Sequence, residues 1–190
     1  MTAHPSIFRL CVILATVVAA APLATAAQDR PLADFFGVYV GVAQVMDATG
    51  QSVAERHLDL EIKPEKPDGF ETTNIVLTLV DGRRDLPGVR RNVIRSAFSH
   101  EEDGLYLVSE RGSLFSKKKV PDPIAGDVLR WARIKGDTLS TLSFAIELDG
   151  RYELQIAERT LTDKGLDLDF RRYVDGALVR SVTGSTVRVE

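Results

Sequence analysis

Arginines beside aromatic residues are the side chains in this sequence best suited to binding a ligand. Arg133 follows Trp131 in one predicted strand, and Arg171 precedes Tyr173 near the end of another. Arg130 also lies in the first of these strands and Arg172 in the second. If the closure of a β-barrel turned one arginine of each pair inward, its guanidinium would be a desolvated cation that needs an anion. A ligand carboxylate or phosphate satisfies such a group with two hydrogen bonds. The alternative is an exposed arginine paired with Asp or Glu across neighbouring strands, the usual situation for this residue.

Other patterns give little support for catalysis or metal binding. The run His-Glu-Glu-Asp at residues 100–103 lies at a predicted hairpin tip, and neighbouring side chains in a strand alternate faces, so they do not converge on one ion. Asp167 and Asp169 could form an acid–base pair, but their alternation with leucines indicates the solvent face of a strand. There is no G-x-S-x-G motif, and the one cysteine is Cys11. We expect no catalytic residues, no metal and no cofactor, and therefore no enzyme.

The elements that would position the arginines are strands. The last third of the chain is predicted to form four of them, joined by glycine turns, at residues 139–148, 151–160, 166–174 and 177–189. Over the whole chain we expect about ten strands and no helix of normal length, in an antiparallel up-and-down meander. Because unpaired edges are avoided, we predict an all-β closed barrel, with a two-sheet sandwich as the alternative.

Two segments depart from this pattern. The first strand, predicted at residues 34–45, is apolar on both faces, and its Gly37 and Gly41 allow either a close approach of another segment or a sharp coil of the strand. Residues 110–126 are irregular, with three consecutive lysines at 117–119 and prolines that cannot donate to a sheet. Long loops of this kind are often functional, so this one is a candidate contact surface.

The amino terminus predicts export. An apolar run at residues 10–21 precedes the small residues Ala24-Thr25-Ala26-Ala27, the layout of a secretory signal peptide. The run is too short to span a membrane as a helix. We expect residues 1–26 to be removed, leaving one domain at 27–190 without cysteine, secreted into a bacterial periplasm. The formal net charge of −3 argues against a nucleic-acid partner.

The opening strand, with Phe36-Gly37, Tyr39 and Gly41, and the hairpin-linked meander resemble the calycin superfamily, which contains the lipocalins and the fatty-acid-binding proteins. Lipocalins open with Gly-x-Trp, where this chain has Gly37-Val38-Tyr39. Fatty-acid-binding proteins hold a carboxylate with an Arg-x-Tyr pair in the last strand. Here Arg171 and Tyr173 have that spacing in the penultimate strand. The resemblance implies a closed barrel that holds a small apolar ligand.

Two functions follow as hypotheses. The first is an exported binding module for a small, largely apolar ligand such as a fatty acid, with or without an acidic head group. The second is a structural or interaction protein of the cell envelope with a packed core and no ligand. Strand alternation places Arg171 out of phase with Leu166, Leu168 and Phe170, so it would point inward only if a β-bulge intervened. The candidate ligand-binding residues for the first hypothesis are Phe36, Tyr39, Trp131, Arg133, Phe144, Phe170, Arg171 and Tyr173.

Overall fold

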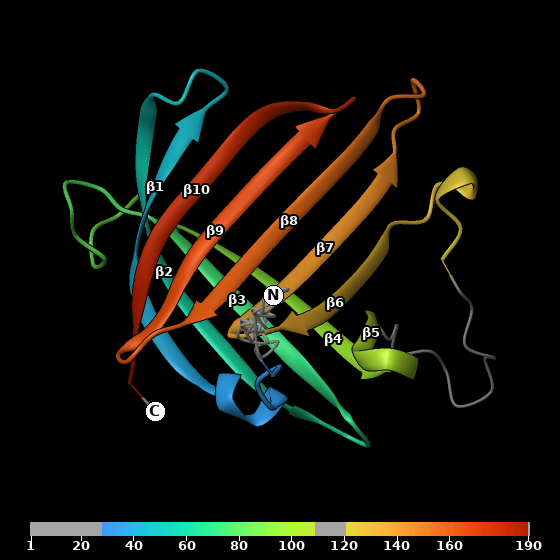
Figure 1. Cartoon of the computed structure of the whole chain (residues 1–190). Coiled ribbons are helices and arrows are strands. Elements are labelled where there is room, and N and C mark those ends of the chain that lie inside the picture. Colours follow the sequence, from blue (N-terminus) through green and yellow to red (C-terminus); the bar gives the residue numbers. More distant parts are fainter. Residues whose placement is uncertain (1–27, 109–120, 190) are drawn as a thin grey trace, which may run out of the picture.

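A computed structural model describes residues 28–108 and 121–189. Ten strands form one antiparallel sheet that closes on itself in the order β1-β10-β9-β8-β7-β6-β5-β4-β3-β2 (Figure 1). The predicted closed meander is confirmed, and the sandwich alternative is wrong. The strands are β1 (Gly37–Asp47), β2 (Ser52–Glu65), β3 (Gly69–Thr78), β4 (Arg90–His100), β5 (Leu105–Val108), β6 (Leu129–Lys135), β7 (Thr138–Ile146), β8 (Tyr152–Leu161), β9 (Gly165–Val174) and β10 (Ala177–Arg188).

Three short 3₁₀ helices accompany the strands in the described residues. They are η1 (Leu32–Phe35), η2 (Glu102–Gly104) and η3 (Pro123–Ala125). The first strand was predicted to begin at Asp34, but Asp34 and Phe35 belong to η1. The predicted signal peptide lies outside the described residues, as do residues 110–120 of the predicted irregular loop. The remainder of that loop contains η3, whose amino terminus is capped by Asp122 accepting from the Ile124 amide.

The strand registers assign every side chain to the inside or the outside of the barrel. Residues directly opposite each other in an antiparallel pair point to the same face, and successive residues alternate. Tyr39 is fully buried inside and pairs with Leu60 on one side and Arg188 on the other. Following the pairs from strand to strand extends this assignment around the whole barrel.

One half of the interior is a packed apolar core, closed at its end by η1 (Figure 1). Phe70 stacks on Phe98 with ring centroids 4.8 Å apart, and Tyr106 meets Phe70 edge-on at 5.3 Å. Offset and edge-on aromatic pairs of this kind add to the stabilisation from burial. The buried core comprises Phe35, Tyr39, Leu60, Ile62, Phe70, Phe98, Tyr106, Ala132, Leu139 and Leu166.

Close approach of strands occurs where β1, β10 and β9 lie side by side. A Cβ atom on Gly41 would lie 2.2 Å from the Ser185 carbonyl oxygen, and one on Gly184 would lie 2.3 Å from the Val42 carbonyl oxygen. Neither position has room for a side chain. The role predicted for Gly41, allowing another strand to come near, is confirmed, and that strand is β10.

Candidate functional site

The interior has a second half, which is open. Here we call it the open half: the part of the barrel between Arg159 and the strand ends farthest from η1. Its inward side chains are only partly shielded, and Ile94 is 51% exposed although it points inward opposite Asn74. In the described residues β5 pairs with β4 only at positions 98–100, so residues 90–97 have no described strand on that side. Solvent therefore reaches the interior of the open half.

Arg159 lies at the floor of the open half, where it meets the apolar core. It faces inward from β8, opposite Leu139 of β7 and Leu168 of β9, and is 6% exposed. Its Nη1 donates to the Thr141 hydroxyl at 2.9 Å, and its Nη2 donates to the Asn74 side-chain oxygen at 3.1 Å. Because Asn74 belongs to β3, the guanidinium reaches across the barrel.

Arg159 has neutral partners only. Within the described part of the chain, no carboxylate oxygen lies within 4.0 Å of its guanidinium nitrogens. Burial lowers the pKa of Arg159 to about 10, so the group still carries its charge at neutral pH. Buried charges in proteins are normally paired, because desolvation of an isolated ion is costly. This cation therefore has the properties of a receptor for an anion that enters from the open half.

The wall of the open half is apolar on one side and polar on the other. Inward residues of β2, β3, β4, β9 and β10 supply the apolar side: Leu58, Val76, Ile94, Phe170 and Val182. Inward residues of β7 and β8 supply polar groups, among them Ser143, Gln155 and Glu153. The lining thus suits a molecule that is itself amphipathic.

Cations outnumber anions near the mouth. Arg172 faces inward and forms an ion pair with Glu153, which lowers the pKa of that carboxyl through a hydrogen bond. Arg56, Arg90, Arg130 and Arg180 also face inward by register. None of these four forms an ion pair within the ranges that the structure describes. The interior surface is therefore positive, although the chain as a whole carries a formal net charge of −3.

The residues predicted from sequence divide between the two faces. Tyr39 and Phe170 point inward, Tyr39 into the closed core and Phe170 into the open half. Phe36 precedes β1 and packs, partly buried, against the core. The other five lie on the outer face and do not line the interior: Trp131, Arg133, Phe144, Arg171 and Tyr173.

Arg171 shows why the phase of a strand matters. The register between β8 and β9 is unbroken, and the bulge nearby lies in β10, between Leu178 and Arg180. Without a bulge in β9, Arg171 stays out of phase with the inward set and points to the outside. There it forms ion pairs with Glu158 and, at 3.0 Å, with Asp169. This is the cross-strand pairing that the sequence offered as the alternative.

Arg159 itself was not singled out from the sequence. The signal lay in β8, where Glu153, Gln155, Ala157 and Arg159 share one face and Tyr152, Leu154 and Ile156 share the other. The apolar face of a strand is ordinarily the one that points inward. The pattern of β8 therefore suggests that its polar residues face solvent. In β8 the polar set faces inward instead, since Arg159 is buried and Tyr152 is 40% exposed.

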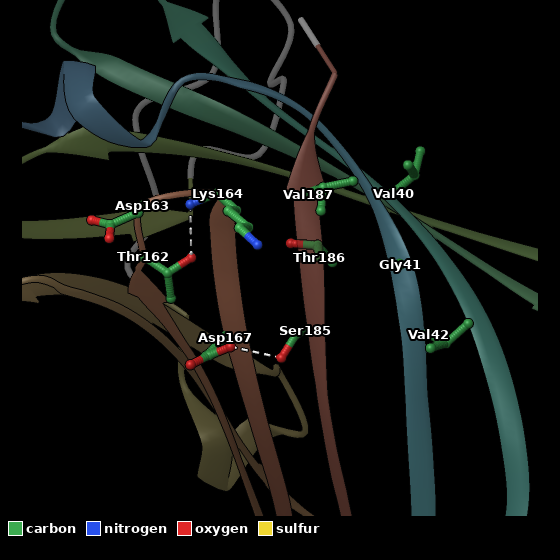
Figure 2. Close-up of a pocket in the computed structure, with 10 residues that line it drawn as sticks. All are labelled: Val40, Gly41, Val42, Thr162, Asp163, Lys164, Asp167, Ser185, Thr186 and Val187. Atoms are coloured by element: carbon green, nitrogen blue, oxygen red, sulfur yellow. Dashed lines mark hydrogen bonds between the residues drawn. The ribbon is translucent and has the colours of Figure 1, made fainter.

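One hollow lies on the outer surface of the barrel, away from Arg159. Figure 2 shows an open groove of about 540 Å³ along the outer surface of β1, β10 and the turn before β9. Val40, Val42 and Val187 form its apolar wall, and Asp167 accepts a hydrogen bond from Ser185 at 2.7 Å. The charged residues of this groove, Asp163, Lys164 and Asp167, are exposed to solvent, so none of them is a buried charge like Arg159.

Comparison with solved structures supports the fold and leaves the function open. No family model and no curated protein matches this chain. Among solved structures, it is similar to a protein of unknown function of the DUF3598 family from Nostoc punctiforme PCC 73102, with 15% sequence identity and a TM-score of 0.54. The match covers 85% of this chain and 51% of the other, so this chain spans about half the length of that protein. At this identity the likeness concerns the barrel fold alone.

In the described residues, no helix is long and apolar enough to cross a membrane.

Proposed function

We propose that this protein is an exported, calycin-like binding module that holds a small, largely apolar ligand with an acidic head group in the open half of the barrel. The observation that carries the proposal is Arg159, a buried cation whose described partners are two neutral oxygens. A carboxylate placed there would gain charge-assisted hydrogen bonds, which are roughly twice as strong as neutral ones. Export rests on the predicted signal peptide, and the periplasm is the proposed location.

The tail of the ligand would lie against the apolar wall of the open half. Leu58, Val76 and Val182 line this wall above Arg159, and Phe170 adds an aromatic surface. Pockets of β-barrels commonly combine such an apolar lining with a few placed polar groups. The direction of binding follows from this layout, with the head group at the floor and the tail toward the mouth.

The test compares a fatty acid with the alcohol of the same chain length. Native mass spectrometry and calorimetry on the mature protein should show uptake of the acid and binding of the alcohol at least about tenfold weaker, since a charged hydrogen bond contributes about 1.5–3 kcal/mol. In the Arg159→Gln variant, the acid should bind no more tightly than the alcohol. Arg133→Gln, on the outer face, is the matched control and should bind as the parent does. No uptake of either ligand would overturn the proposal.

The second candidate, an envelope interaction protein, is favoured by a different surface. An outer apolar face covers β6 to β9 and consists of Trp131, Leu142, Phe144, Leu154, Ile156 and Tyr173. All six are partly exposed, and contiguous apolar patches on a surface mark interaction sites in many proteins. Trp131 is the only tryptophan, so its emission should shift to the blue when cell-envelope extract covers this face and stay unchanged when a fatty acid enters the interior.

A further inference from the structure

Two arginines lie at the mouth of the open half, on the two strands that follow the strand of Arg159. Arg172 of β9 and Arg180 of β10 are directly opposite each other in register and both face inward. Arg172 also lies opposite Gln155 of β8, four residues before Arg159 on the same face. The mouth and the floor of the open half therefore each carry guanidinium groups, arranged along one direction.

The arginines at the mouth are not fully satisfied by the protein. The ion pair with Glu153 uses the terminal nitrogen of Arg172, while its Nε is buried and has no hydrogen-bond partner. Arg180 forms neither an ion pair nor a side-chain hydrogen bond within the described ranges. Two carboxylates lie near these guanidinium groups: Glu153 pairs with Arg172, and Asp47, opposite Arg180 in register, accepts hydrogen bonds from Thr49 and Gln51 of its own turn. The Nε of Arg172 and the guanidinium of Arg180 can therefore still accept a ligand oxygen as partner.

The spacing between the two positions follows from strand geometry. Arg159 lies opposite Leu168, and Arg172 is four residues farther along β9. At a rise of 3.2–3.4 Å per residue, the backbones at these positions are about 13 Å apart. The inward residues between them are Ala157 and Phe170, which are apolar and pair with each other. The order from floor to mouth is therefore cation, apolar surface, cation.

We propose that the ligand is a linear amphiphile with an acidic group at each end, of the class of medium-chain α,ω-dicarboxylates. One carboxylate binds Arg159 at the floor, the chain lies along Phe170, and the second carboxylate binds Arg180 and the Nε of Arg172 at the mouth. This inference rests on the proposed function and adds a second head group to it. A ligand with one head group would leave the mouth arginines to solvent.

The experiment titrates the mature protein with linear monoacids and diacids of increasing chain length, by calorimetry. One medium-chain diacid should bind at least about tenfold tighter than the monoacid of the same length, and shorter and longer diacids should lose this gain. Arg180→Gln should abolish the gain and leave monoacid affinity unchanged. Arg159→Gln should weaken both ligands, and Arg133→Gln, on the outer face, should change neither.

The possible outcomes separate the two proposals. The proposal of a second head group fails if monoacids bind and diacids bind no tighter. It also fails if Arg180→Gln still binds the diacid more tightly than the monoacid. In both cases the binding function stands. If neither class binds, the binding function fails and this inference fails with it. Because Arg180 is exposed at the rim, its replacement should leave the urea midpoint unchanged, which confirms that the variant is folded.

Discussion

The guanidinium of Arg188 lies over the ring of Tyr39, with its carbon 5.2 Å from the ring centroid, and its Nε donates to the tyrosine hydroxyl at 3.1 Å. The same hydroxyl donates to the Phe35 carbonyl oxygen at 2.8 Å, and Nη2 of Arg188 donates to the Asp34 carbonyl oxygen. These contacts join the last strand to the first and both to η1. The closed end of the barrel is therefore held by one tyrosine and one arginine.

Tyr39→Phe tests this junction. The change removes the hydroxyl and leaves a buried carbonyl and part of the guanidinium without a partner, which should lower the free energy of unfolding by about 1–3 kcal/mol. Urea denaturation measures the loss. Tyr152→Phe, on the outer face, is the control and should change stability by no more than about 0.5 kcal/mol. Equal effects of the two changes would show that the junction adds no stability.

Arg159→Met separates a binding role from a structural one. Replacing a buried charge with an apolar side chain of similar length should leave the free energy of unfolding unchanged or raise it by about 1–4 kcal/mol. Acid-ligand binding should be lost at the same time. Thermal and urea unfolding of the unliganded variant provide the measurement. A loss of about 3 kcal/mol or more would instead show that the bridge from Arg159 to Asn74 holds the barrel together.

Glu153 should make stability depend on pH in the acid range. The hydrogen bond from Arg172 lowers the folded-state pKa of this carboxyl below its ordinary value of 4.5. A depressed carboxyl pKa contributes stability above the unfolded pKa, and the contribution disappears as pH falls through the folded pKa. Glu153→Gln should therefore be less stable than the parent at pH 7, and the difference should vanish under acid. If the difference in urea midpoint between Glu153→Gln and the parent stayed constant from pH 7 to acid, this expectation would be contradicted. Glu102→Gln, at an exposed position, is the control.

Gly41→Ala tests the close approach of β1 and β10. The added methyl would lie 2.2 Å from the Ser185 carbonyl oxygen and 2.8 Å from the Thr186 Cα, so the two strands would have to separate. We expect a loss of about 1–3 kcal/mol in the free energy of unfolding, as for other overpacked positions. Val42→Ala, next to it on the outer surface, should cost no more than about 0.5 kcal/mol. Urea midpoints of the two variants compare them directly.

Local sequence signals were sufficient for the strands and the turns. At the β9–β10 hairpin, Asp175 and Gly176 have φ values of 50° and 80°, the positive angles that this pair of residues favours in a tight turn. The adjoining strands were found because β-branched and aromatic residues alternate there with polar ones. Closure followed from the physical cost of unpaired edges, a property of the whole sheet.

The faces of the strands were not determined by the same signals. Alternation reports that Leu154 and Ile156 share a face, but it does not report which face is inward. In β9 the apolar set containing Leu168 and Phe170 is inside, and in the neighbouring β8 the apolar set is outside. The phase of each strand depends on its register with its neighbours. Arg159 belongs to the polar set of β8, and alternation alone does not show that this set faces inward.

The pairing of β1 with β10, which closes the barrel, has a consequence for the time course of folding. It pairs Tyr39 with Arg188, which are 149 positions apart, so the barrel cannot close before almost the entire chain is available. Contacts between such distant positions give a high contact order, and folding slows as contact order rises. During synthesis, the edge of β1 that faces β10 therefore stays unpaired until the last strand is available. Acquisition of the closed barrel should be a late and comparatively slow event, completed only after the whole chain has emerged.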